Sequence, residues 1–290
     1  MNFKYKNILQ HFFSSIPKGV KLNYLFQKHI TNTLPVSEDK FIFKANTAFN
    51  HLKNFQQFNT LKTNSKKYYE FGAGWDLIVP IAICHLGYNS TVVDIRRLLI
   101  NNLVENSINR FLSLKNKLSF KIKNTEAKQL NDFSLKYDAP IDARHTKFDE
   151  NYFDFSSSTA TMEHIPPIDI LNILNETYRI MKKGGVLSMT IDYRDHWAYF
   201  DKKISVYNFL QYSDKKWKKY NPSLNYQNRL RHCDYLDIIS KTKFKIVKNK
   251  PSLPTKKQQK QLENIKLNNM YKDYSYSDLE ILASEIVLIK

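Results

Sequence analysis

The stretch that decides the fold is YYEFGAGWD, residues 68–76. The chain of 290 residues has only six glycines, and two of them, Gly72 and Gly74, stand one residue apart in this stretch. The aromatic residues before them are typical of a short strand. Glycine permits a tight turn and lets a ligand approach the backbone where a Cβ would clash. A strand, Gly-x-Gly and a helix in that order indicate a nucleotide-cofactor turn, although the motif alone would also fit an ordinary strand-to-helix turn.

Beyond this turn, strand-like and helix-like segments alternate. The segments STVVDI, YFDFSSS and GGVLSMTID have the composition of strands, and residues 168–181 form a helical stretch between the last two. Near the C-terminus, FKIVK and EIVLIK predict two more strands. Alternating strands and helices favour an α/β fold with a parallel sheet.

The region before the turn has a helical pattern instead. We predict that residues 1–66 form a helical cap on a larger domain, residues 67–290, and that residues 192–232 are an inserted substrate lid dense in aromatic and polar side chains. Ser37 is a plausible N-cap of the third helix. The apolar faces expected of the three helices are Phe3, Ile8, Leu9, Phe12, Phe13 and Ile16; Leu22, Leu25, Phe26 and Ile30; and Phe41, Ala45, Ala48, Leu52 and Phe55.

Composition narrows the classes of protein that need to be considered. The formal net charge of +18 fits an anionic partner, but the excess is nearly all lysine, which compositional bias would also produce. The longest apolar run, residues 77–86, is too short to cross a bilayer, and we expect no signal peptide. The two cysteines, Cys84 and Cys233, lie far apart, which fits a reducing cytoplasm.

Three features around the turn favour a cofactor without phosphates. Leu77 stands where a dinucleotide fingerprint has its third glycine, and Asp76 would repel a pyrophosphate at the helix N-terminus. Asp94 ends the next strand, where a carboxylate accepts hydrogen bonds from both ribose hydroxyls or caps the following helix. Glu70 adds a carboxylate suited to a cationic ligand. A phosphate-free, positively charged nucleoside describes S-adenosylmethionine (SAM).

On these motifs the chain resembles the class I SAM-dependent methyltransferases. EFGAG is similar to their first motif, E-x-G-x-G, and VVDI to the second; APIDARHT, FDFSSSTATMEHIPP and MKKGGVLSMTID resemble the regions that follow. The resemblance implies a Rossmann-like, seven-stranded, mostly parallel sheet with an antiparallel final strand. It departs at Asp76, where glycine is common, and at Lys183, where proline is usual. The cofactor-binding residues that it implies are Glu70, Gly72, Ala73, Gly74, Asp94, Ile95, Asp142 and Ala143.

The acceptor is expected beyond the fourth and fifth strands, since ligands of open parallel sheets lie at the carboxyl ends. His196 is the leading candidate for a general base, because imidazole titrates near neutral pH. Asp195 would orient it or act itself, and Glu163 would face the same site. His196 and Asp195 could equally be an exposed pair on a lid helix. These side chains could also hold a divalent metal, but their spacing is not diagnostic, and we predict none.

Further lid residues are candidates for binding the acceptor. Arginine and amide side chains recognise carboxylates or phosphates, or are ordinary surface charge. Aromatic, amide and acidic groups together suit a carbohydrate, whose C–H faces pack on rings, and also a stacked base. The predicted substrate-binding residues are Asp192, Trp197, Tyr199, Asn225, Arg229 and Arg231.

The sequence therefore predicts a SAM-dependent methyltransferase that modifies an oxygen of a sugar, a polysaccharide or another small molecule. The alternative is an RNA methyltransferase, which the positive charge favours. A non-enzymatic binding protein is a third reading. Peripheral contact with a membrane is compatible with the charge, and the sequence gives no oligomeric state.

Overall fold

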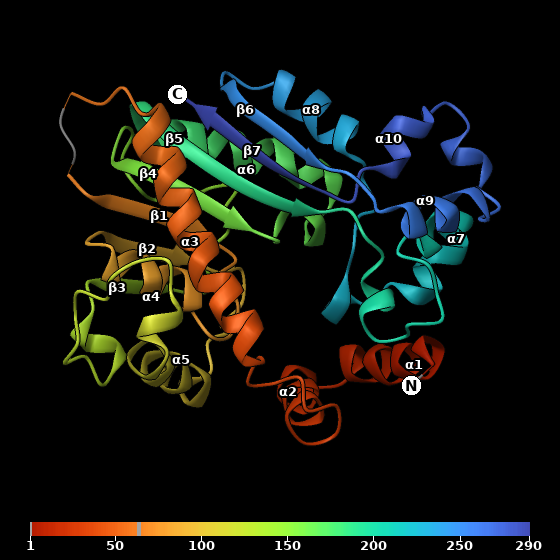
Figure 1. Cartoon of the computed structure of the whole chain (residues 1–290), viewed down its shortest axis with the longest axis horizontal. Helices are drawn as coiled ribbons and strands as arrows, with labels where there is room; N and C mark the ends of the chain where they lie inside the picture. The colour runs from red at the N-terminus through yellow and green to blue at the C-terminus, as the bar shows by residue number, and fades with distance from the viewer. Residues whose placement is uncertain (1, 63–64) are drawn as a thin grey trace.

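The computed structural model describes residues 2–62 and 65–290, and among these a seven-stranded sheet forms the centre of the molecule (Figure 1). The strand order is β3-β2-β1-β4-β5-β7-β6, and β7 runs antiparallel to both of its neighbours. The predicted Rossmann-like fold is thereby confirmed, with β3 as a strand that the sequence analysis had not located. The bounds are β1 Lys67–Phe71, β2 Asn89–Val93, β3 Leu135–Asp138, β4 Phe153–Thr159, β5 Met181–Asp192, β6 Lys245–Ser252 and β7 Ala283–Ile289.

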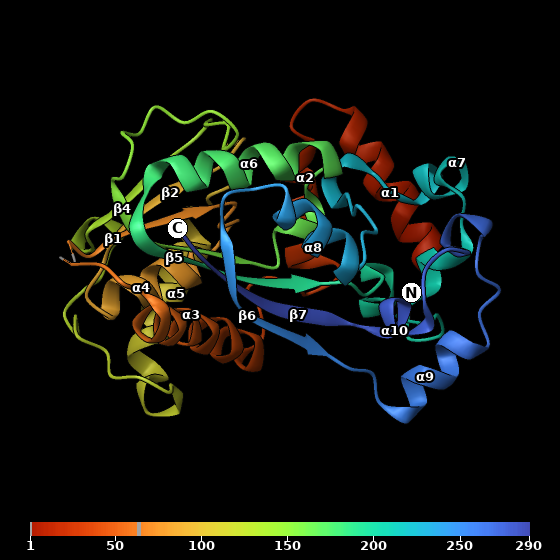
Figure 2. The same cartoon turned by 90° about the horizontal axis from the view of Figure 1, so that it is seen from above.

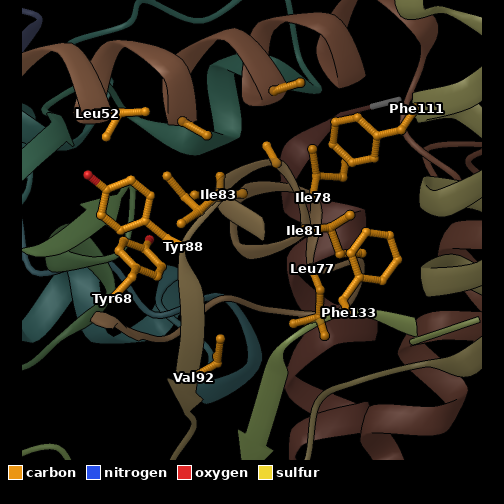
Figure 3. Close-up of a cluster of buried hydrophobic side chains, with 14 of the residues drawn as sticks. Leu52, Tyr68, Leu77, Ile78, Ile81, Ile83, Tyr88, Val92, Phe111 and Phe133 are labelled. Carbon is orange, nitrogen blue, oxygen red and sulfur yellow. The ribbon is translucent and has the colours of Figure 1, made fainter. Parts of the chain in front are cut away.

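Helices cover both faces of the sheet (Figure 2). One face carries α3 (Glu38–Phe58), α4 (Ile78–His85) and α5 (Asn101–Ser113), and Figure 3 shows part of the apolar core that they share with the strands. The other face carries α6 (Pro167–Ile180) and α8 (His232–Ser240), which pack in a second core. The central strand β4 is buried along most of its length, including its polar residues Ser156, Ser157 and Ser158, whereas the edge strand β6 is largely exposed.

Helix α3 agrees with its predicted pattern. The Ser37 side chain accepts a hydrogen bond from the backbone N–H of Lys40 at 3.4 Å, which caps the first turn. All five residues of the expected apolar face are at most 4% exposed, and they pack into the core of the sheet. Within residues 1–66, α3 therefore packs directly on one face of the sheet.

Helices α1 (Phe3–Ser15) and α2 (Gly19–His29) differ from the prediction. Ile8 is 63% exposed and Phe12 is 58% exposed, so the expectation that the apolar stripe of α1 faces a core is wrong. The reason is its partner: α1 lies on the lid, and Asn7 donates a hydrogen bond to the carbonyl of Lys219 at 2.8 Å. The buried face of α1 is accordingly Phe3, Lys6, Asn7 and Gln10, while Leu22, Leu25 and Ile30 of α2 are exposed.

The lid consists of short helical turns on a small core of its own. It comprises η4 (His196–Tyr199), η5 (Asn208–Gln211), α7 (Asp214–Trp217), η6 (Lys218–Tyr220) and η7 (Ser223–Asn225). Its apolar side chains pack with those of α9 (Lys256–Glu263), η8 (Asn269–Tyr271) and α10 (Tyr276–Glu280). Three further turns are η1 (Lys115–Lys117), η2 (Leu130–Asp132) and η3 (Met162–His164). Across the described residues, no helix is both long and apolar enough for a membrane span.

Candidate active site

The glycine turn follows β1 and has the backbone conformation that its residues predict. Gly72 has φ +72° and Gly74 has φ +78°, both in the left-handed region that favours glycine. A Cβ on Gly72 would lie 2.5 Å from the Thr161 side chain, which approaches from the end of β4. A Cβ on Gly74 would meet nothing within 4 Å among the described residues. Gly72 thus lets two strand ends approach, and Gly74 leaves room beside the turn for a ligand.

Two buried carboxyl groups stand at this turn. Asp94, at the end of β2, accepts a hydrogen bond from the Tyr137 hydroxyl at 2.9 Å and another from the Gly74 backbone N–H. Burial raises the pKa of Asp94 to about 6. Glu70 accepts a hydrogen bond from the Tyr68 hydroxyl at 2.8 Å, and burial raises its pKa to about 8. A cation placed beside Glu70 would favour its ionised form.

Asp76 fills the N-terminus of α4. Its carboxylate accepts a hydrogen bond from the Ile78 N–H at 3.4 Å and forms an ion pair with Lys44 at 2.8 Å. A pyrophosphate would have to displace this carboxylate, so the turn suits a cofactor without phosphates. Leu77 takes the left-handed conformation with φ +49°, which is strained for a residue with a Cβ.

The loop after β3 lies next to Asp94. The backbone N–H of Ile141 donates to the Asp94 carbonyl at 2.8 Å, which brings Asp142 and Ala143 to the same edge of the sheet. Asp142 forms a 2.6 Å ion pair with Arg144, and this hydrogen-bonded contact lowers the pKa of Asp142. No motif in the sequence predicts that contact. An adenine amino group bound here would have to share the Asp142 carboxylate with Arg144. Ala73 is half-buried, and Ile95 is 61% exposed.

Beyond β4 and β5, a second set of polar side chains gathers. Glu163, in the turn η3, is 2% exposed, and its carboxylate oxygens have no hydrogen-bond partner among the described residues. Burial raises the pKa of Glu163 to about 8. The rings of His164 and His196 lie with their centroids 4.9 Å apart. Ligand atoms of Glu163, His164 and His196 all lie within 4.8 Å of one another.

The acid beside His196 is Asp192, at the end of β5. The His196 Nε2 atom lies 3.7 Å from Asp192 Oδ2, and Arg194 and the Tyr199 hydroxyl also bind this carboxylate. Burial lowers the pKa of His196, but its contact with Asp192 outweighs that effect and the net shift is upward.

Asp195, expected to orient His196, lies in a different environment. It is fully buried and accepts hydrogen bonds from the Trp197 N–H and the Asn208 side chain, each at 2.8 Å. Its carboxylate therefore anchors the start of η4 to η5. The acid that the His196 ring faces is therefore Asp192 and not its sequence neighbour Asp195.

Several predicted acceptor residues support the lid from inside. Arg231 is 0% exposed and donates to the carbonyls of Tyr193, Leu279 and Ile281. Arg229 is also buried, where it pairs with Asp214 and donates to the carbonyl of Tyr212. Trp197 is 1% exposed and packs against Phe3. Tyr199 is 42% exposed, and Asn225 is half-buried.

Two residues at this edge escaped the sequence analysis. Tyr137 holds the Asp94 carboxylate, and the Thr161 hydroxyl donates to the Gly72 carbonyl at 3.3 Å. Tyr137 lies on the strand that the sequence analysis did not locate. Thr161 lies inside a quoted motif, but its contact depends on the pairing of β1 with β4.

One family model and several solved structures are similar to this chain. Residues 70–189 match a family model described as a methyltransferase domain. Similar solved structures include a SAM-dependent methyltransferase from Methanosarcina mazei, with 14% identity, TM-score 0.45, and coverage of 82% of this chain and 96% of that one. Another is geranyl diphosphate C-methyltransferase from Streptomyces coelicolor, with 11% identity, TM-score 0.49, and coverage of 95% and 85%.

A third is phosphoethanolamine N-methyltransferase 2 from Haemonchus contortus, with 17% identity, TM-score 0.45, and coverage of 91% of this chain and 59% of that one. A search of curated proteins finds no match. The family match begins at Glu70 and spans the glycine turn, Asp94, and strands β4 and β5 to residue 189. Residues 70–189 therefore match a methyltransferase domain, the class of domain that uses SAM as its methyl donor.

Proposed function

We propose that this methyltransferase transfers the methyl group of SAM to a hydroxyl oxygen of a sugar, a polysaccharide or another small acceptor. The observation that supports this most directly is the contact between Thr161 and Gly72, which joins the end of β4 to the cofactor turn. Glu163 follows Thr161 by two residues, so the polar cluster lies near the position expected for the methyl group.

Methyl transfer to a hydroxyl needs alignment and removal of a proton. The acceptor oxygen attacks opposite the sulfonium sulfur, and the protein must position it and take its proton. We assign His196 as the general base, with the nearby Asp192 carboxylate orienting its ring. Glu163 would bind the acceptor hydroxyl from the opposite turn.

The cofactor would lie along the glycine turn. Asp94 would accept hydrogen bonds from the ribose hydroxyls. The carboxyl groups of Glu70 and Asp76 would favour the positively charged end of SAM. Asp142 and Ala143 would border the adenine, provided that Arg144 shares the Asp142 carboxylate.

Recognition of the acceptor would fall to the residues that remain accessible. Tyr199 is exposed in part and offers a ring face, Asn225 offers an amide, and Asp192 would have to share its carboxylate with Arg194 and Tyr199. Rings and acids of this kind suit sugar hydroxyls and C–H faces. Arg229, Arg231 and Trp197 act instead by holding the lid in place.

RNA methylation is the second candidate, and a surface feature favours it. A hollow between the lid and α9 is lined by Lys203, Lys257 and Lys260 together with amide side chains. Lysines attract phosphates without reading sequence. The hollow lies on the lid surface, and no described contact links it to the cofactor turn.

The test is transfer of a labelled methyl group from SAM to a lysate divided into glycan, RNA and small-molecule pools. We expect the label in glycans or hydroxylated small molecules, with the Asp94→Ala variant as the blank. Label that is released by ribonuclease would overturn the proposal in favour of the RNA alternative.

A further inference from the structure

We propose that Glu163, His164 and His196 form a binding site for a divalent transition-metal ion next to the methyl-transfer position. Each residue offers one ligand atom, and the three atoms lie within 4.8 Å of one another. They come from two separate turns, η3 after β4 and η4 after β5. The sequence gives no metal-type spacing because the site forms only when these strands pair.

Unpartnered polar atoms are the first argument for an ion. Both carboxylate oxygens of Glu163 and the Nε2 atom of His196 are buried without a hydrogen-bond partner among the described residues, although the Asp192 carboxylate lies 3.7 Å from that Nε2 atom. A buried polar group without a partner costs about 1–3 kcal/mol, and more if it is charged. Three such atoms around one point are costly unless a ligand occupies it. A cation would satisfy all three.

The hydrogen bond of His164 is the second argument. Its Nδ1 atom lies 2.6 Å from the carbonyl oxygen of Tyr226. A carbonyl only accepts, so Nδ1 carries the proton and Nε2 keeps a free lone pair. Metal-binding histidines typically have their other ring nitrogen held in this way.

The lid holds both turns through three consecutive residues. Tyr226 binds the ring of His164, and the Gln227 side chain accepts from the backbone N–H of His196 at 3.2 Å. The Asn228 amide donates to the carbonyls of Met162 and Ile165, each at 2.9 Å, and so fixes the turn that carries Glu163. The ligands are therefore positioned in advance by a shared support, as a metal site requires.

The ligand set points to a particular class of ion. Two imidazoles and one carboxylate suit Zn²⁺, Mn²⁺ or Fe²⁺, whereas Mg²⁺ prefers an all-oxygen shell. Three protein ligands leave further positions open for water or for an acceptor oxygen. Asp192, 3.7 Å from His196, lies close enough to hydrogen-bond a group bound there.

The chemical consequence rests on the proposed O-methylation. The ion would bind the acceptor hydroxyl and lower its pKa, and the proton would pass to solvent water. The acceptor oxygen would form its bond to the methyl carbon while the carbon–sulfur bond breaks. The sulfur would keep the electron pair and leave as the neutral thioether. In that state His196 acts as a ligand and not as the base.

The test is direct measurement of metal binding to the full chain, purified without a histidine tag and freed of metal with a chelator. Zn²⁺ and Mn²⁺ are titrated by calorimetry, with Mg²⁺ as the comparison. We expect one Zn²⁺ or Mn²⁺ per chain, and weaker binding of Mg²⁺. The Glu163→Gln and His196→Gln variants are expected to lose about 100-fold or more in affinity, and Asn228→Ala about tenfold.

The control is His145→Gln, since His145 is exposed and lies outside the cluster. Binding of SAM shows that each variant is folded. Wild-type protein that binds SAM but no stoichiometric Zn²⁺ or Mn²⁺ would overturn the metal proposal, as would equal affinity in Glu163→Gln and His145→Gln. Protein that binds the metal but methylates only RNA would support the metal proposal and overturn O-methylation of a small acceptor.

Discussion

The two halves of the sheet's carboxyl edge are built differently. At the ends of β1 and β2, the carboxyl groups of Glu70 and Asp94 already have tyrosine hydroxyls as partners. At the ends of β4 and β5, the Glu163 carboxylate and the Nε2 atom of His196 have no hydrogen-bond partner among the described residues, and the nearest charge to that Nε2 atom is Asp192 at 3.7 Å. The cofactor half is complete as a protein structure, whereas the acceptor half still needs partners for its polar atoms.

The two halves should therefore respond separately to mutation. Changes in the cofactor half should alter affinity for SAM. Changes in the acceptor half should alter turnover while leaving that affinity nearly intact. Substitutions at His196, Gly74 and Asp94 test this separation.

The largest effect is expected at His196. The His196→Gln variant removes the group proposed to take a proton or bind a metal, so kcat should fall by about 10²- to 10⁴-fold. Its affinity for SAM should stay within about twofold, because no ligand of the cofactor turn is lost. Measurement of kcat with saturating SAM, beside calorimetric binding of SAM, tests this. Unchanged turnover would remove His196 from the chemistry.

The next effect is expected at Gly74. The Gly74→Ala variant places a Cβ beside the turn, where the cofactor is expected to approach, and strains a left-handed backbone by about 1–2 kcal/mol. We expect SAM affinity to fall by about tenfold to 100-fold.

Gly87→Ala is the matched control for strain, since Gly87 has φ +94° and follows α4 away from the turn. Thermal unfolding should register both substitutions, but calorimetry with SAM should register only Gly74→Ala. Equal affinities for SAM would show that Gly74 does not border the cofactor.

The smallest effect concerns pH and Asp94. Its ionised carboxylate is expected to accept the ribose hydroxyls, and its pKa is raised to about 6. As the pH falls below 6 the carboxylate takes up a proton, so SAM affinity at pH 5 should be about tenfold weaker than well above pH 6. Because Glu70 also titrates, the informative quantity is the difference from Asp94→Asn. That variant should bind weakly at every pH and lack this component of the profile.

The elements around β1 and β2 could be predicted from the sequence more completely than those after β4 and β5. The glycine turn after β1 could be predicted because its backbone requires glycine at fixed positions, and Asp94 could be placed beside it because it ends the next strand. Helix α3 could be predicted because its apolar face meets an apolar sheet. These are local rules, and residues at known spacing satisfy them.

The acceptor half could not be predicted in the same way. Asp192 and not Asp195 faces His196 because the turn η4 consumes the Asp195 carboxylate as a cap. Helical periodicity predicted α1 correctly. Because α1 packs on the lid, however, the side that carries Lys6, Asn7 and Gln10 is the buried one. Arg229 and Arg231 are residues of the type that binds anionic ligands. Their partners in the structure are instead Asp214 for Arg229 and backbone carbonyls, such as that of Leu279, for Arg231.

Buried Arg231 has a consequence for how substrates enter and leave. Outward movement of the C-terminal end of the lid would separate the Arg231 guanidinium from three carbonyl acceptors. We therefore expect that end of the lid to stay in place. Helices α1 and α2 rest on the same lid through contacts such as the hydrogen bond of Asn7. Tyr24 of α2 packs against Trp75, the residue after the glycine turn. Helices α1 and α2 therefore connect the lid with the glycine turn, and we expect ligand exchange to require their displacement.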